Sequence, residues 1–559
     1  MCAIQISHDL EGGTDTPAPG LGAEGSRSAF SYLFPGLADA PDAGRFTGTD
    51  DEGTIRRLKD FEKACRLGNP LFAPPALTFD LPAAYTYFGQ FLNHDISAPV
   101  GGLLQNPDDV PPLGIVGTVD LPGLGKDWRA DVATILRHFV NEQARPLTLA
   151  SLYGDGPGSD DDEITALYEP DGSFCLAKAY RVPIDILGES TKRPQAAIHA
   201  KDAHDIPRAG RRPLIADRRN DGNLILSQLH LAFMMFHNKA LKAFWARNLQ
   251  GTTADIFAQA RQLVTRHYHW LILNDFLPAL LSKTVLAKPL SEWKPRPLPP
   301  GTVPMEFSTA AFRFGHSMVG RSYDFNANFG RGGALEHEAT LLQLLTFTSD
   351  RKMGDAQGRV PQLPDHWVID WDRLTSTQPP SDAEEASGQA ERIDLDFAPD
   401  MLNEAGDARI TEHGSIFFRN LLRGFHRRIP FGQKLAQACG VPVLAPEQIK
   451  DAMPQRQSPS GTSPAKAAHD LRILDETPAW LYFLCEAQVL EGGTRVGPTA
   501  SQIIADTIVS LMQEQSSSVL PNGGGAWHPR DSLLKAPSDT PLDSLRSFLL
   551  FASHGPQSS

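Results

Sequence analysis

Cysteine is scarce and scattered in this chain of 559 residues. The five cysteines form no CxxC pair and lie at Cys2, Cys65, Cys175, Cys439 and Cys485. A disulfide framework needs an even, regularly spaced set, and a structural zinc site needs paired ligands. This distribution argues against both. It indicates a reducing compartment, in which cysteine acts as a small apolar side chain.

Long apolar runs are also missing. The longest candidates, "HLAFMMF" and "WLILNDFLPALL", either fall short of the roughly 18 residues that a membrane span needs or contain Asp275. The first residues, "MCAIQISHDLEGG", have neither the basic nor the apolar segment of a signal peptide. We therefore expect no membrane span, and a location in the cytoplasm or, by a non-classical export route, outside the cell.

Positive charge is in short supply. Lysine and arginine number 52 against 66 aspartates and glutamates, which leaves a net charge of −14. This balance argues against a general nucleic-acid binder. Walker, Rossmann and serine-hydrolase signatures are absent, since the glycine-rich "GGTRVG" and "GRGG" lack a strand-to-helix context.

What the chain does have is helical periodicity. Apolar residues recur at spacings of three and four along 221–248, which predicts a long amphipathic helix. Further helices are expected at 54–68 ending at Gly68, at 253–281 with a kink or an end at Pro278, at 307–320 and at 499–515. Few segments alternate as strands do, and 457–468 is expected to be a loop. The fold class is therefore mainly α, with long loops and little β.

The chain is expected to divide into two parts. Residues 1–74 would form an irregular N-terminal arm and a first helix, and residues 75–559 one large domain. No repeat of solenoid length occurs.

The stretch "YFGQFLNHDIS" places Gln90 and His94 four residues apart, so both lie on one face of a helix. Two interpretations stay open: a polar rim facing water, or polar groups directed at something buried. His316 follows Gly315, which could let a large flat ligand approach; a packed core histidine is the alternative. The segment "ADRRNDGN" could hold an inward arginine or simply cap a helix.

The other histidines favour a structural role. His267 and His269 are two residues apart, so a helix points them in different directions. His230 and His237 could share a helix face, but no carboxylate stands near them in the sequence.

Four motifs, taken in order, resemble the animal-type haem peroxidase (peroxidase–cyclooxygenase) superfamily, particularly its bacterial members. They are "YTYFGQFLNHDIS", "ADRRNDGNLILSQLHLAFMMFHN", "AFRFGHSMVG" and "FFRNLLRG". The resemblance implies that His94 is the distal acid–base residue, that Arg219 stabilises developing anionic charge and that Gln90 helps to hold water or halide. It implies that His316 ligates haem iron, that Asn420 orients His316 and that Arg313 contacts the cofactor.

The resemblance also implies which family features are altered. Positions that link haem covalently in mammalian relatives are Asn93, Gly222 and Asn223 here, so we expect non-covalent haem b, with Asp221 as the only nearby carboxylate that could compensate. Calcium would be bound by Asp95 and the loop "RPLTLASLYG". Because Thr148 and Ala150 replace expected oxygen donors there, a weak or lost calcium site is expected.

The function implied is that of a haem peroxidase. Hydrogen peroxide would be reduced through an oxoferryl intermediate, and a small donor, such as a halide, thiocyanate or phenol, would be oxidised. Two alternatives stay open. The first is a fatty-acid dioxygenase, although Arg313 stands where such relatives carry a radical-forming tyrosine. The second is a haem-binding protein with little turnover. The sequence leaves the donor and the oligomeric state undetermined.

Overall fold

The computed structural model describes about three-quarters of the chain. The described residues are 28–66, 78–101, 129–141, 143, 145–181, 198, 200, 202–210, 212–345, 347–348, 363–377, 388–402, 415–456, 458, 461–515, 519–520 and 526–553. Expectations for the first 27 residues and for Gly68 lie outside these ranges.

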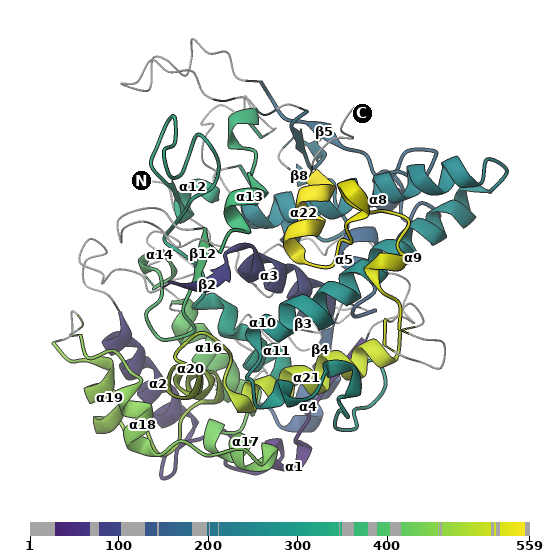
Figure 1. Cartoon of the computed structure of the whole chain (residues 1–559). Coiled ribbons are helices and arrows are strands. Elements are labelled where there is room, and N and C mark those ends of the chain that lie inside the picture. Colours follow the sequence, from purple (N-terminus) through teal and green to yellow (C-terminus); the bar gives the residue numbers. More distant parts are fainter. Residues whose placement is uncertain are drawn as a thin grey trace.

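Helices dominate the described residues, which confirms the mainly α fold class (Figure 1). The longer helices are α2 (Asp51–Cys65), α3 (Ala84–Ile96), α8 (Leu224–Arg247), α9 (Thr253–Leu271), α16 (Ile416–His426), α17 (Gly432–Cys439), α20 (Ala479–Glu491), α21 (Pro498–Gln513) and α22 (Leu545–Ser553). The shorter ones are α1 (Pro35–Ala38), α4 (Val132–His138), α5 (Ala150–Tyr153), α6 (Asp162–Thr165), α10 (Leu277–Leu280), α11 (Met305–Thr309), α12 (Leu341–Leu344), α13 (Trp371–Leu374), α14 (Pro399–Leu402), α18 (Pro446–Asp451) and α19 (Pro464–Asp470).

Strands are short and form small sheets. The largest sheet has the order β3 (Pro99–Gly101), β4 (Phe139–Asn141), β1 (Ser28–Ser31) and β9 (Thr302–Pro304). The remaining strands pair two by two: β2 (Thr78–Pro82) with β12 (Gln389–Glu391), β5 (Ala177–Lys178) with β6 (His204–Asp205), β7 (Arg208–Ala209) with β8 (Arg212–Pro213), and β10 (Ser322–Tyr323) with β11 (Ala339–Thr340). β1 pairs with two distant strands, so Ser28–Ser31 form part of this sheet.

Helix α3 lies in the middle of the molecule, with α8 on one side and α10 and α11 on the other (Figure 1). Apart from Gly89 and Gln90, every residue of α3 is buried. The long helix α8 begins where Asn223 caps it, its side chain accepting the Leu226 N–H at 2.9 Å. Helices α9 and α22 pack against α8. The region around α3 is therefore held on several sides by apolar contacts.

Several boundaries differ from those that periodicity predicts. The segment 307–320 is not one helix: α11 ends at Thr309, Ala310 leaves helical geometry (φ −131°, ψ −60°), and a 3-10 helix, η6 (Ala311–His316), follows. Helix α2 ends at Cys65 with extended backbone at Arg66, before Gly68. Part of the expected loop 457–468 is helical, because Ser463 caps α19.

The helix predicted over 253–281 ends at Leu280, but it is not uniform. A π-helical segment, η3 (Ile272–Phe276), separates α9 from α10, and Pro278 stands in the first turn of α10. Proline is tolerated there because that position needs no N–H donor. Among the described residues, no helix is long and apolar enough to cross a membrane.

Candidate active site

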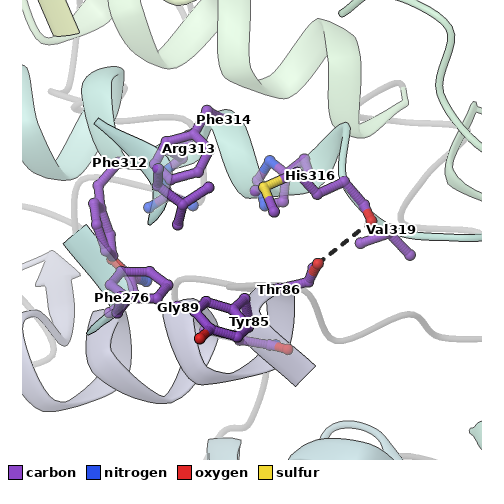
Figure 2. A pocket seen from close by; sticks show the side chains of 14 residues that line it. Tyr85, Thr86, Gly89, Phe276, Phe312, Arg313, Phe314, His316 and Val319 are labelled. Atoms are coloured by element: carbon purple, nitrogen blue, oxygen red, sulfur yellow. Dashed lines mark hydrogen bonds between the residues drawn. The ribbon is translucent and has the colours of Figure 1, made fainter. Parts of the chain in front are cut away.

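A pocket opens beside α3. One face of α3 lines it with Tyr85, Thr86, Gly89, Gln90 and Asn93, residues whose spacing brings them to the same side of a helix (Figure 2). The opposite wall is the segment 312–319, which carries His316, and Phe276 and Leu280 close one side. The pocket encloses about 540 Å³ of empty space, including its opening to solvent.

Two glycines shape the pocket. At Gly89 an added Cβ would lie 3.1 Å from the ring of Phe276, so a side chain there would push the wall away. At Gly315 an added Cβ would meet no atom within 4 Å. The space beside His316 is therefore open, as a large flat ligand would require.

His316 is 8% exposed and is held from behind by α16. Asn420 Nδ2 lies 3.0 Å from His316 Nδ1, and Asn420 Oδ1 accepts a hydrogen bond from Arg423 Nη1 at 3.3 Å. Rotation of the Asn420 side-chain amide by half a turn exchanges the positions of its oxygen and its nitrogen. Ligation of a metal through Nε2 needs that turned orientation, in which Oδ1 accepts the Nδ1 proton.

Arg313 lines the same wall, three residues before His316. It is buried, its Nε donates to the Ser308 carbonyl at 2.8 Å, and its own carbonyl accepts a hydrogen bond from Trp480 Nε1 at 3.2 Å. These contacts fix the η6 backbone from which His316 projects.

His94 is completely buried, so a water-facing rim on this part of α3 is ruled out. His94 Nδ1 lies 2.9 Å from Asn220 Oδ1, and Asn220 Nδ2 lies 3.1 Å from His230 Nδ1. Burial lowers the pKa of His230 to about 3, so its ring is neutral and can accept from Asn220. The amide oxygen of Asn220 then accepts from His94, which places the His94 proton on Nδ1 and leaves Nε2 as the basic nitrogen.

Arg219 is directed to the backbone near His94. Its Nη2 donates to the His94 carbonyl at 2.9 Å and its Nη1 to the Ser97 carbonyl at 2.8 Å. The guanidinium also pairs with Asp217, with Nη2 and Oδ2 2.6 Å apart. Burial, the largest single influence, opposes the ionisation of Asp217, but the charge and the hydrogen bonds of Arg219 together with smaller contributions outweigh it and lower the Asp217 pKa.

The residues singled out in the sequence thus fall into two groups. Gln90, Arg313 and His316 line the pocket, and Asn420 contacts His316. Among the described residues, the pocket lining does not include His94 or Arg219. Gln90 Oε1 accepts a hydrogen bond from Asn223, at the start of α8, at 3.1 Å.

Asp95 turns to the other side of α3, toward the loop before α5. Its Oδ2 accepts the Leu149 N–H at 3.1 Å, and its Oδ1 accepts the N–H and the hydroxyl of Ser151, both at 3.2 Å. The carboxylate therefore caps the first turn of α5. Burial raises the pKa of Asp95 to about 6 despite these bonds. Nowhere in the described ranges do three or more histidine, cysteine, aspartate or glutamate side chains cluster as a metal site would require.

Asp221 is held in a buried ion pair. Arg208 Nη1 lies 2.6 Å from Asp221 Oδ2, and Arg208 Nη2 lies 2.7 Å from Asp221 Oδ1. Arg208 Nε also contacts Asp205 at 3.3 Å. Both carboxylate oxygens of Asp221 thus accept hydrogen bonds from Arg208, which also pairs with the buried carboxylate of Asp205.

Replacing Arg208 by methionine is expected to destabilise the fold by about 3–5 kcal/mol, since two carboxylates would be left buried without their cation. The free energy of unfolding from denaturant titration measures this. Arg212→Met is the matched control: its side chain is 44% exposed and pairs with Glu163 at the surface, so its cost should be about 0–1 kcal/mol. Equal losses in the two variants would contradict the assignment.

The histidines expected to be structural have separate, buried partners. His267 Nε2 lies 2.8 Å from Ser532 Oγ, and His269 Nε2 lies 2.7 Å from the Leu147 carbonyl. His237 contacts the Tyr153 hydroxyl at 3.0 Å. These three agree with a structural role, whereas His230 contacts the chain of hydrogen bonds that leads to His94.

Sequence patterns did not single out Asn220, and they favoured a purely structural role for His230. Asn220 stood in a segment that also fits helix capping, and His230 lies on an apolar helix without a nearby carboxylate. The single available signal was the position of Asn220 directly after Arg219.

Comparisons with known proteins give a consistent assignment. Residues 189–357, which include the segments of Arg219 and His316, match the family model of the animal haem peroxidase. Rat thyroid peroxidase is 31% identical over 188 residues, 33% of this chain, and Dual oxidase 1 of Caenorhabditis elegans is 32% identical over 106 residues, 19% of this chain. The matched part spans only 20% of the rat protein and 7% of the worm protein.

Solved structures share the fold over most of its length. Peroxidase A from Dictyostelium discoideum superposes with a TM-score of 0.53 at 15% identity, covering 91% of this chain and 93% of that chain. Fatty acid alpha-dioxygenase from Oryza sativa gives a TM-score of 0.51 at 11% identity, covering 88% and 81%. The chain is thus similar to animal haem peroxidases over residues 189–357, and it shares its fold with these solved structures.

Proposed function

We propose that this protein is a haem peroxidase that reduces hydrogen peroxide and oxidises a small halide, thiocyanate or phenolic donor. The observation that carries the proposal is the pocket between α3 and the η6 segment, with His316 on one wall and Gln90 on the other. His94 follows Gln90 by one helical turn and is held in the tautomer of a general base.

The pocket residues fit a haem. His316 would ligate the iron, Asn420 would orient the imidazole, and Gly315 leaves room for a flat ring beside it. The phenylalanines of η6 and Phe276 supply an apolar wall. Bound haem would supply the redox-active iron, which no side chain can provide.

His94 would transfer the proton of hydrogen peroxide. Its Nε2 would accept a proton from hydrogen peroxide and return it to the departing oxygen, acting first as base and then as acid. Asn220 and His230 hold the Nδ1 proton in place meanwhile. Arg219 binds the His94 carbonyl and so ties α3 to the segment before α8. We infer a positioning role for Arg219 in this arrangement, because its charge is neutralised by Asp217; direct charge stabilisation requires its guanidinium to leave that partner.

The nature of residue 313 favours a peroxidase over a fatty-acid dioxygenase. Arg313 is buried on the pocket wall and held by the Ser308 carbonyl. A guanidinium cannot form the oxygen-centred radical that a tyrosine at this position would form. The likeness to the rice dioxygenase supports the shared fold and does not extend to its substrate.

A non-covalent haem b agrees with the chemistry around the pocket. Asn93 lines the pocket as an amide, and Asn223 is used as a helix cap. Asp221 could form an ester only by leaving Arg208, which binds both of its oxygens. We infer that haem is held without a covalent bond, by His316 and by contacts with the pocket walls.

Acid extraction is therefore expected to release the haem quantitatively into the organic phase with the mass of free haem b. Mass spectrometry of the extract and of the remaining protein provides the measurement. Haem that stays attached to a peptide containing Asp221 would contradict a non-covalent site.

A calcium ion does not fit at Asp95. The carboxylate accepts hydrogen bonds from N–H and O–H donors, whereas a calcium site offers the ion several oxygen atoms. The loop oxygens are also engaged, since Thr148 Oγ1 donates to the Arg145 carbonyl and the Thr148 carbonyl faces Arg261. We infer that the protein stabilises this loop without the ion.

Chelation is accordingly expected to leave stability unchanged, with a shift of the melting temperature below about 1 °C, because only an ion that binds the folded state can add stability. Calorimetry of the haem-loaded protein in excess chelator and in about 1 mM calcium (about 100 times a dissociation constant of about 10 μM) gives the measurement. A bound ion under that condition adds about 2.7 kcal/mol, so a drop of several degrees on chelation would overturn this inference.

The experiment that tests the function is an absorption titration of the haem-loaded protein. The Soret band should change on addition of one equivalent of hydrogen peroxide and recover when iodide or a phenol is added. A Soret band that does not respond to peroxide would replace the peroxidase by a haem-binding protein with little turnover. Absence of a Soret band would remove the haem site itself.

A further inference from the structure

Tyr85 connects the pocket to a carboxylate outside it. Its ring lines the pocket on the α3 side (Figure 2). Its hydroxyl donates a hydrogen bond of 2.7 Å to Asp275 Oδ1. The pocket lining itself does not include Asp275 among the described residues, so the phenol group spans the wall.

Asp275 belongs to the π-helical segment η3, which interrupts the helix between α9 and α10. Such segments often occur at functional sites. The same segment brings Phe276 into the pocket wall, where its ring stacks on Tyr85 with centroids 6.3 Å apart. Asp275 is half-buried, and its neighbour Asn274 is exposed. The second oxygen of Asp275 accepts the Leu545 N–H at 2.6 Å, which fixes the carboxylate against α22.

We propose that Tyr85 and Asp275 form a redox-active pair that carries electrons from bulky phenolic donors at the protein surface to the haem in the pocket. The inference rests on the proposed peroxidase function, because it needs haem that peroxide has oxidised. It adds a second place for donor oxidation, open to molecules too large for the pocket.

The electron and the proton leave Tyr85 by different routes. The phenol of Tyr85 would give up its electron to bound haem that hydrogen peroxide has oxidised. The O–H bond breaks, and its proton moves along the 2.7 Å hydrogen bond to the Asp275 carboxylate. The products are a neutral tyrosyl radical and a neutral carboxylic acid. Burial raises the pKa of Asp275 above its ordinary value, which favours receipt of the proton.

The surface donor then restores the pair. A phenol near η3 loses one electron to the tyrosyl radical and one proton to water, and becomes a phenoxyl radical. Asp275 returns its proton to the Tyr85 oxygen. Two such cycles supply the two electrons that one hydrogen peroxide takes up on reduction to water. Burial raises the pKa of Tyr85, so between cycles the phenol keeps its proton.

Electron paramagnetic resonance of the haem-loaded protein, frozen after mixing with one equivalent of hydrogen peroxide, tests the pair. We expect a tyrosyl radical whose hyperfine structure narrows when the protein is made with ring-deuterated tyrosine. Tyr85→Phe should lose this signal, because phenylalanine keeps the ring that packs on Phe276 but has no hydroxyl. Asp275→Asn should lower the radical yield at least fivefold, because an amide cannot take the proton.

Tyr87→Phe is the matched control. Tyr87 is on the same helix, but its hydroxyl donates to Tyr323 at 2.9 Å and it is not part of the pocket lining. It should keep the signal. A second readout is the rate with a phenol coupled to dextran divided by the rate with iodide, which should fall at least tenfold in Tyr85→Phe.

The possible outcomes distinguish failure of the proposed Tyr85–Asp275 pair from failure of the proposed peroxidase function. The redox role of Tyr85 and Asp275 is overturned, while the proposed peroxidase function stands, in either of two cases. In the first, the Soret band changes with peroxide but the wild type shows no tyrosyl radical. In the second, the radical signal survives in Tyr85→Phe. A Soret band that does not respond to peroxide overturns the proposed function and this inference with it. Melting temperatures of the three variants verify that each is folded.

Discussion

Replacing His316 by alanine is expected to abolish the Soret band of the reconstituted protein. His316 is the histidine on the pocket wall, and it stands beside the open space at Gly315. Loss of a residue that orients a metal ligand commonly costs about 10–100-fold in affinity, so loss of the ligand itself should exceed that range. Haem titration followed by absorbance gives the dissociation constant.

A matched control separates loss of the ligand from loss of the fold. His267→Ala removes another buried histidine, one whose Nε2 contacts Ser532 far from the pocket lining. It should lower stability but keep the Soret band. Asn420→Ala should have an intermediate effect, because His316 would lose the group that contacts its Nδ1. Haem binding that is equally tight in His316→Ala and the wild type would place the cofactor elsewhere.

Replacing His94 by alanine is expected to slow the reaction with hydrogen peroxide by about 10²–10⁴-fold while haem stays bound, because removal of a positioned acid–base residue has an effect of this size. Stopped-flow absorbance measures the peroxide step directly, and the equilibrium spectrum measures haem content. His94→Gln serves as the second variant. It retains a polar side chain on α3 but cannot accept the proton.

The chain of hydrogen bonds behind His94 makes the expectation more specific. If Asn220 sets the tautomer, Asn220→Leu should also slow the peroxide step and should shift its pH profile, since the His94 ring would no longer be held with its proton on Nδ1. Peroxide kinetics that are unchanged in His94→Ala would remove the acid–base role of this histidine, whatever the behaviour of Asn220.

Local features of the fold could be read from the sequence because they depend on neighbouring residues. Spacings of three and four placed the ends of α8 and α21 to within about three residues, and the i,i+4 relation of Gln90 and His94 followed from helix geometry. The break at Ala310 was missed because a window of apolar residues does not distinguish an α-helix from a short α-helix followed by a 3-10 turn.

The candidate site, too, could be predicted from the sequence only in part. The order of four motifs in the sequence implied which histidine faces which, and the structure places Gln90 and His316 on opposite walls of one pocket. The motifs did not indicate that Arg219 would pair with Asp217, two residues away, while donating to the His94 carbonyl. The direction of a long flexible side chain depends on every group within its reach.

The sequence by itself determined the fold class and the helix that carries Gln90 and His94, because periodicity is a property of the chain, and the order of its motifs indicated the resemblance to animal-type haem peroxidases. Only the tertiary structure decided the contacts of His94 with Asn220, 126 residues away, and of Tyr85 with Asp275, 190 residues away. Such contacts form when packing of apolar faces brings distant segments together. Spacing along the chain has no direct bearing on which polar groups then meet.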